Sequence, residues 1–229
     1  GFSGSESSRQ ERNSTTNQTI LSGDIGNIND GSDNTFHVVV PSNGSHLEGF
    51  IIQDGNASEN YSDSRGKGAG LYAKEVTFSV TECFFKNNRA NQKGGGIYGE
   101  NSIINTTSCT FSHNKGGAIS LSYCVLDDVN SSLLNNDTTS SGGAIDFQDS
   151  NLSLTGTLFY NNQSSFAGGA LSGTQSNISV IDCNFTNNQV IAFNEGDFLN
   201  LNDVVFELNP PLVSWARLRK TRRFFSSNL

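Results

Sequence analysis

The chain has 229 residues, with 22 acidic and 14 basic side chains and a formal net charge of −8. Five of the basic residues lie in the last 13 positions, so the rest of the chain carries nine (14 − 5) against 22 acidic residues. This acidic body argues against a nucleic-acid partner, because phosphate binding needs clustered Lys and Arg. No run of about 18 apolar residues could span a bilayer, so we expect membrane attachment only through segments outside this chain.

Glycine, with 24 residues, and the small polar residues Asn, Ser and Thr dominate the composition, whereas proline occurs three times. This mixture is typical of many short strands joined by tight turns. It favours helices poorly, because Gly, Asn and the β-branched residues rank low in helix propensity. We therefore predict an all-β chain, whose first strands lie near 19–25, 36–40 and 47–53.

A short repeat with two elements follows these strands. The first element is a Gly-rich segment with an aliphatic residue in its fourth position, found at 68–72, 94–98, 116–120, 142–146 and 168–172. The second is an F-x-x-N motif whose first residue, Phe or Leu, always lies 14 positions after the aliphatic residue. The pairs are Leu71/Phe85, Ile97/Phe111, Ile119/Leu133, Ile145/Phe159 and Leu171/Phe185.

The repeat length is 26, 22, 26 and 26 residues, and one joint accounts for the difference. Five residues usually follow the Asn of the motif, whereas Lys115 alone separates Asn114 from Gly116. A constant block with one variable joint predicts that the joint is a surface turn. Apolar positions two apart within the block predict short strands. Stacked coils of 22–26 residues then form a right-handed, single-stranded parallel β-helix.

Two sets of side chains are expected to line up along the stacked coils, at a spacing of about 4.8 Å. One is a stack of phenylalanines inside the solenoid: Phe85, Phe111, Phe159 and Phe185. The other is a ladder of asparagines that pass amide hydrogen bonds between coils at a turn: Asn88, Asn114, Asn162 and Asn188. Asp128 interrupts an otherwise apolar position, so we predict a one-residue slip that turns Val129 inward.

The domain boundaries follow from the repeat. Residues 1–46 are predicted to form an N-terminal cap with the first coils, 47–209 the repeats and 210–229 a basic tail. Prolines at 210 and 211 end the repeat in this interpretation, because Pro cannot donate to a β ladder. The tail itself is interpreted as a disordered or capping segment, with a membrane-surface contact as the alternative.

The alternation of GGA[I/L] with F-x-x-N resembles the repeats of the polymorphic outer membrane proteins (Pmp) of chlamydial type. The motifs that carry the resemblance are GGAI at 116–119 and 142–145, GGAL at 168–171, FSHN at 111–114, FYNN at 159–162 and FTNN at 185–188. The resemblance covers roughly residues 47–209 and implies a parallel β-helix. Family members are typically passenger parts of autotransporters, and several act as adhesins. The resemblance thus implies a location outside the cell or on the outer membrane surface.

Parallel β-helices include polysaccharide lyases and glycoside hydrolases, whose sites need paired carboxylates, or Ca²⁺-binding carboxylates with a basic residue. The candidates here are Asp127, Asp128, Asp146 and Asp149. No Lys, Arg or His of neighbouring coils aligns with them in the sequence. We therefore interpret them as exposed polar residues and expect no catalytic site and no cofactor. The three histidines share no ligand spacing, so no metal site is expected.

Cys83 and Cys109 occupy the same position in adjacent coils. One interpretation is a ladder of small buried thiols. The other is a disulfide formed in an oxidising compartment, since the coil spacing lies within the Cα range of such a bond.

The leading functional hypothesis is a cell-surface or secreted protein that serves adhesion or displays loops on a rigid rod. Its partner would be a receptor or glycan on a host or neighbouring cell. Binding is expected in the longest joint, 54–67, which contains Tyr61 and Arg65, residue types that are frequent at binding hot spots. The alternatives are a carbohydrate-active enzyme and a purely structural surface-layer element.

Overall fold

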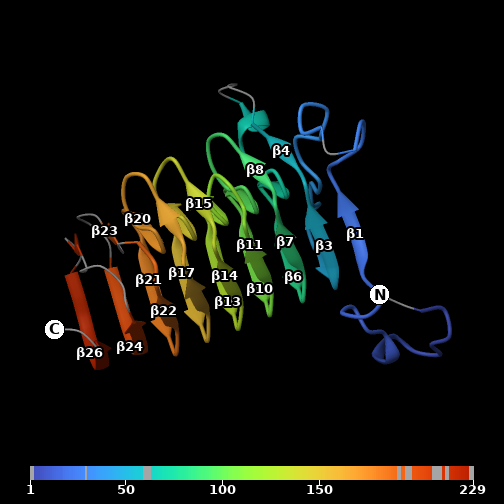
Figure 1. Cartoon of the computed structure of the whole chain (residues 1–229). Helices are drawn as coiled ribbons and strands as arrows, with labels where there is room; N and C mark the ends of the chain where they lie inside the picture. Colours follow the sequence, from blue (N-terminus) through green and yellow to red (C-terminus); the bar gives the residue numbers. More distant parts are fainter. Residues whose placement is uncertain are drawn as a thin grey trace.

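The computed structural model describes residues 3–28, 30–58, 63–189, 192–193, 198–207, 213–214 and 217–226. The strands lie side by side in chain order, from β1 (Thr19–Ser22) at one end to β26 (Arg217–Ser226) at the other (Figure 1). All pairings between strands of the described residues are parallel. The only helices described are two 3₁₀ turns, η1 (Arg9–Glu11) and η2 (Ser64–Gly66).

The largest sheet contains two rows of stacked strands. The first row is β2 (Ser45–Glu48), β6 (Thr77–Thr81), β10 (Ile103–Thr107), β13 (Val125–Val129), β17 (Asn151–Thr155) and β21 (Asn177–Ile181). The second row is β1, β3 (Phe50–Gln53), β7 (Phe84–Lys86), β11 (Thr110–Ser112), β14 (Ser132–Leu134), β18 (Leu158–Tyr160) and β22 (Asn184–Thr186). Strand β24 (Phe198–Glu207) extends over both rows, because it pairs with β21 and with β22.

A second sheet closes each coil. It is built from β5 (Leu71–Lys74), β9 (Ile97–Glu100), β12 (Ile119–Ser122), β16 (Ile145–Gln148), β20 (Leu171–Thr174), β23 (Ala192–Phe193) and β25 (Val213–Ser214). Two-residue strands in the joints form two further pairs, β4 (Asn56–Ala57) with β8 (Arg89–Ala90) and β15 (Asp137–Thr138) with β19 (Gln163–Ser164).

The pairing register has the period that the sequence predicts. The residues Leu71, Ile97, Ile119, Ile145 and Leu171 are successive partners in the second sheet. Their separations are 26, 22, 26 and 26 residues, so one coil is four residues shorter than its neighbours. The predicted all-β parallel β-helix is confirmed.

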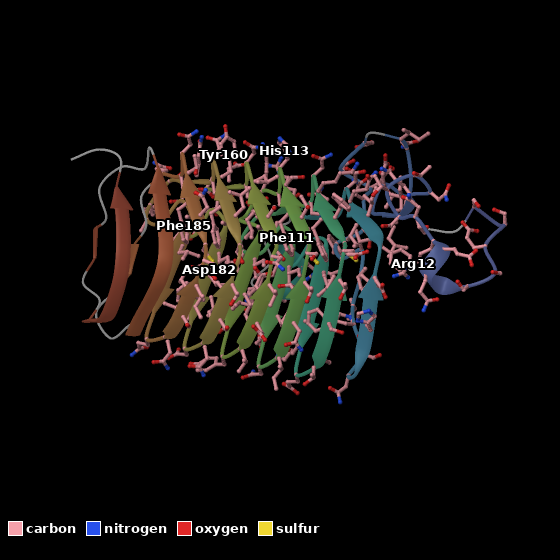
Figure 2. The ribbon with its side chains drawn as sticks, turned by 90° about the horizontal axis from the view of Figure 1, so that it is seen from below. Arg12, Phe111, His113, Tyr160, Asp182 and Phe185 are labelled. Atoms are coloured by element: carbon pink, nitrogen blue, oxygen red, sulfur yellow. The ribbon has the colours of Figure 1, made fainter. Side chains whose placement is uncertain are left out.

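The core is a column of apolar side chains inside the coils. Phe85 stacks on Phe111 with ring centroids 4.9 Å apart, and Phe159 stacks on Phe185 at 4.4 Å. Leu133, also fully buried, occupies the equivalent position between these two pairs. Figure 2 shows Phe111 and Phe185 inside the ribbon, while His113 and Tyr160 lie at its rim. The four predicted phenylalanines thus form two stacks with a leucine between them.

Each complete coil turns at three corners, and each corner places one residue in the left-handed region. In the coil of β9 these residues are Asn101, Ser108 and His113, with φ of 50°, 51° and 55°. Asn and Asp adopt this conformation more readily than most residues, and they recur here at Asn87, Asn130, Asn135, Asp149, Asn161, Asp182 and Asn187. The abundance of Asn in the sequence is therefore partly a requirement of the corners.

A ladder of buried asparagines stabilises the corner that follows the second row. Asn114 donates from its side-chain Nδ2 to Asn136 Oδ1 at 3.0 Å and to the carbonyl of Phe85 at 2.9 Å. Its backbone N–H donates to the same Oδ1 at 3.0 Å. The same pattern joins Asn88 to Asn114, Asn136 to Asn162 and Asn162 to Asn188. The ladder therefore contains the four predicted asparagines and Asn136.

The other two corners use smaller side chains in the same way. The backbone N–H of Cys109 donates to Ser131 Oγ at 3.2 Å, and that of Thr157 to Cys183 Sγ at 3.4 Å. At the remaining corner, the N–H of Cys124 donates to Ser150 Oγ at 3.0 Å. Ser, Thr and Cys are interchangeable at these positions because each is small and carries an acceptor atom.

All four cysteines are buried free thiols. Burial raises the pKa of each, that of Cys109 to about 12. Of the two interpretations of Cys83 and Cys109, this structure contains the thiol ladder.

The predicted slip at Asp128 is wrong. Asp128 pairs with Thr106 and Leu154 in register and is fully buried, whereas Val129 is half-buried. The hydroxyls of Thr106 and Thr157 donate to its carboxylate at 2.5 and 2.6 Å, which offsets part of the cost of burying the charge. A slip would instead have moved a whole strand's side chains to the opposite faces. Burial raises the pKa of Asp128, although the hydroxyl hydrogen bonds act in the opposite direction.

The expected end of the solenoid near residue 209 also needs correction. Strand β26, which lies within the predicted tail, pairs in parallel with β24 over Phe198–Phe206. An additional strand covers the backbone N–H and C=O groups that β24 would otherwise present as an open edge. At the other end, β1 pairs with β3, so a strand of the first coils lies within residues 1–46 and near 19–25, as expected.

Candidate binding groove over the short coil

The joints between the second row and the second sheet stack along one side of the solenoid. Residues 56–57 pair with 89–90, and residues 137–138 pair with 163–164. Between them, Lys115 alone bridges Arg89 and Asp137. Each joint of five or more residues therefore forms a ridge on this side of the solenoid. The coil of 22 residues has only Lys115 as its joint, so one ridge is missing there.

A pair of glycines makes the short joint possible. Gly116 and Gly117 both have positive φ, 87° and 84°. In the preceding, longer joint only the first glycine of the pair, Gly94, has a positive φ, of 67°, and Gly95 does not. A Cβ on Gly116 would lie 2.4 Å from the carbonyl oxygen of Ala90, and one on Gly117 would lie 2.8 Å from that of Gly142. Only glycine accepts both the dihedral angles and the close approach.

The missing ridge leaves a groove of about 530 Å³. Asn91, Gln92 and Lys93 of one joint form a wall with Lys67, and Ser140 of another joint lies on the opposite side. The floor comes from the second sheet and contains Tyr98, Ser122 and Gln148. The lining is thus mostly polar and comes from three coils and three joints.

Lys93 and Asp146 form an ion pair at this groove, with Nζ 2.6 Å from Oδ2. Asp146 was expected to be exposed without a basic partner, and this expectation is wrong, since its exposed fraction is 9%. Lys93 reaches it because the equivalent residue of the intervening short coil is the small Ser120. Burial raises the pKa of Asp146, and the Lys93 ammonium opposes this shift.

Stacked aromatic rings form the N-terminal end of the groove floor. The ring of Tyr72 lies 4.9 Å from that of His37 and 5.7 Å from that of Tyr98. Lys67 Nζ lies 4.9 Å from the centre of the Tyr98 ring and 3.4 Å from its hydroxyl. Burial raises the pKa of Tyr98 and lowers that of His37, so both rings are neutral at pH 7.

A second ion pair lies next to this stack. Lys74 Nζ is 2.7 Å from Glu100 Oε1, and this hydrogen bond holds the pKa of Glu100 below its usual value. Sequence reasoning missed these residues, although one signal was present. Tyr72 and Tyr98 both directly follow the aliphatic residue of the Gly-rich segment.

The other candidate carboxylates do not join Asp146. Asp128 points into the core, Asp127 is exposed on the first row, and Asp149 is a half-buried corner residue. Among the described residues, no group of three or more His, Cys, Asp or Glu side chains is arranged to hold a metal ion. Nor does the described part of the chain contain a helix long and apolar enough to cross a bilayer.

Of the two residues singled out in the 54–67 joint, Tyr61 lies outside the described residues. Arg65 lies in η2 and its guanidinium is 2.8 Å from the Asp63 carboxylate, which lowers the pKa of that carboxyl group. The base of this joint contacts the groove wall, because the Gln92 N–H donates to the carbonyl of Gly66 at 2.9 Å. The described base of the longest joint, 63–67, therefore adjoins the groove.

The architecture defines the class to which this protein belongs: a repetitive parallel β-solenoid that presents its variable joints along one side. Residues 82–100 match the family model of the Chlamydia polymorphic membrane protein repeat. The match runs from the F-x-x-N motif of one coil into the second sheet of the next, and the solenoid fits a Pmp-repeat β-helix. No curated protein and no solved structure matched the chain. The matched segment covers a short part of the chain and agrees with the repeat resemblance seen in the sequence.

Proposed function

We propose that this protein is a surface-exposed adhesin whose joint side binds a receptor or glycan on a host or neighbouring cell. The observation that carries the proposal is the concentration of irregular features on that side. The longest joint, the missing ridge and the groove all lie together, whereas the rest of each coil repeats in register.

The distribution of side chains supports binding at the joints. Interior positions are used for packing, and the corner asparagines are used to satisfy backbone groups. Loops held by a rigid scaffold are where binding residues concentrate. Tyr61 and Arg65 of the longest joint remain the predicted contact residues, and Arg65 would exchange its local partner Asp63 for a ligand.

The Lys93–Asp146 pair beside Tyr98 is the one observation that favours the enzyme alternative. A base in this groove would need to accept a proton, yet the Lys93 ammonium donates to a carboxylate and burial raises the pKa of Tyr98. We therefore propose binding without catalysis and without a cofactor. Pectate lyase and polygalacturonase assays should show no turnover with or without Ca²⁺. Turnover that disappears in Asp146→Asn would contradict this proposal.

Attachment of the purified protein to cells and glycan arrays tests adhesion. Replacing residues 56–66 with a short Gly/Ser linker should abolish attachment or weaken it strongly. The matched control replaces joint 163–167, which lies on the same side but outside the groove lining. Attachment that survives the first change and is lost in the second would move the site away from the longest joint. A parent protein that attaches to nothing would favour the structural surface-layer alternative.

A further inference from the structure

We propose that the groove over the short coil binds an acidic sugar, whose carboxylate is held by Lys67 and Lys93. This inference rests on the proposed adhesive function and names the ligand class and the binding site. It also assigns a role to the four-residue shortening of one coil, which has no evident structural purpose.

The two lysines are placed as a pair. Lys67 and Lys93 are bridge partners in adjacent coils, so their backbones are about 4.8 Å apart. Both side chains line the groove. Lys67 contacts the neutral Tyr98 phenol, whereas Lys93 contacts the Asp146 carboxylate while its side chain stays 40% exposed. Two ammonium groups one coil apart can both donate to one carboxylate.

The local charge supports an anionic ligand. Two ammonium groups, Lys67 and Lys93, line the groove, whereas none of its lining residues is a carboxylate, and Asp146 pairs with Lys93 beside it. The groove is therefore locally cationic on a body with 22 acidic and nine basic residues. Such a contrast orients an anion toward this one position, because the surrounding surface repels it.

The remaining lining residues match sugar hydroxyls. Asn91, Gln92 and Gln148 supply amides that both donate and accept, and Ser122 and Ser140 supply hydroxyls. A hydroxyl-rich ligand can exchange hydrogen bonds with such groups, whereas a lipid or an apolar peptide face offers none. A hydroxyl-rich ligand with one carboxylate satisfies both the amides and the lysines.

The width of the groove follows from its origin. A missing ridge removes one layer of backbone, so the slot is one strand spacing, about 4.8 Å, wider than the space between consecutive ridges. This accommodates one layer of ligand, such as a single sugar ring standing on edge. A folded protein surface is too broad to enter such a slot.

The experiment measures binding of 3′-sialyllactose and of trigalacturonate, with lactose and the trigalacturonate methyl ester as neutral counterparts. The full chain is titrated with each sugar by calorimetry. Lys67→Gln removes the charge but keeps an amide. The matched control, Lys86→Gln, removes one charge from β7 in the largest sheet, which contributes no residue to the groove lining. We expect Lys67→Gln to weaken acidic-sugar binding by about tenfold or more and Lys86→Gln to leave it unchanged.

A second variant restores the missing ridge. Inserting four residues between Lys115 and Gly116 gives the short joint the five residues of its neighbours and fills the groove. The other coils show that the fold accepts this length, and circular dichroism with a thermal melt verifies it. The insertion should abolish binding of the acidic sugars.

The outcomes separate this inference from the proposed function. Equal binding of acidic and neutral sugars, no binding of either, or binding unaffected by the insertion would overturn the inference. If cell attachment then still depends on residues 56–66, the adhesive function stands without the groove. If the protein binds acidic sugars through Lys67 but attaches to no cell, the groove is an acidic-sugar site and the proposed adhesive function is wrong. If Lys67→Gln abolishes cell attachment but the parent protein binds no acidic sugar, the groove has a different anionic partner, and the proposed ligand class is wrong.

Discussion

Asn136 accepts two hydrogen bonds from Asn114 on a single oxygen, one from the backbone N–H and one from the side-chain Nδ2, both at 3.0 Å. Asn88, Asn114, Asn136 and Asn162 thus each connect three coils, because their own Nδ2 also reaches a carbonyl in the preceding coil. Buried backbone groups at the corner are satisfied only through these side chains.

Asn162→Ala should therefore lower the free energy of unfolding by about 1–3 kcal/mol, since it leaves buried donors and acceptors without partners. Urea denaturation measures the change. The control is Asn151→Ala, which removes an exposed amide that contacts Asn177 on the first row. An equal effect of the two substitutions would contradict the structural role of the ladder.

Phe111→Asp should cost several kcal/mol, because it places a charge in the packed interior column. Phe111→Leu should be tolerated far better, since Leu133 occupies the equivalent position of the next coil. Thermal melts of both variants measure the difference. Similar melting temperatures would mean that position 111 does not face the core.

Asp128 makes stability depend on pH. Burial raises its folded-state pKa above the usual value of an aspartate, so the folded state binds the proton more tightly than the unfolded chain does. The resulting stabilisation is complete below the unfolded pKa and is lost as the pH rises through the folded pKa. Ionised Asp128 therefore lowers stability at neutral pH. The substitution Asp128→Asn removes the carboxyl group and should therefore remove this pH-dependent contribution to stability.

Denaturant melts at pH 7 and pH 4 measure this effect. The stability of the wild type relative to Asp128→Asn should increase as the pH falls toward 4. The exposed neighbour Asp127 provides the control, because Asp127→Asn removes a carboxylate without changing the buried one. The nearby thiols of Cys109 and Cys183 are neutral across this range, because burial raises their pKa values. An Asp128→Asn difference that is equal at both pH values would contradict the prediction.

The four thiols should be unreactive in the folded protein. They are buried and their raised pKa values keep them protonated, whereas the thiolate is the nucleophile. Ellman's reagent should detect no fast-reacting thiol in native buffer and four thiols in concentrated urea. A denatured count of two would reveal a disulfide, with Cys83 and Cys109 as the first pair to map.

The fold could be predicted from the sequence because its determinants are periodic. The constant spacing of Leu71 from Phe85, repeated at every coil, is visible without any knowledge of the turns. The glycines of the joints and the asparagine of each F-x-x-N motif indicate where the chain turns. Periodicity of this kind fixes the register of neighbouring coils.

The groove could not be predicted in the same way. Lys115 revealed that a joint was short, but the pattern does not show which side of the coil the other joints cover. The Lys93–Asp146 pair joins residues 53 positions apart across two coils, and its existence depends on the path of a joint that has no repeat. Asp128 escaped prediction because its partners, Thr106 and Thr157, come from the preceding and following coils.

The corner hydrogen bonds give the solenoid a direction. At all three corners, a backbone N–H of one coil donates to a side-chain acceptor of the coil that follows it in the chain. Removing coils from the C-terminal side would strand buried N–H donors on the new last coil. Removing them from the N-terminal side would strand a different set of donors, because N–H groups next to the corners, such as those of Ser132 and Asp137, donate to carbonyl groups of the preceding coil. The two ends of the rod are therefore chemically different. The last coil presents N–H groups that need side-chain acceptors, whereas the first coil presents side-chain acceptors and N–H groups that need carbonyls.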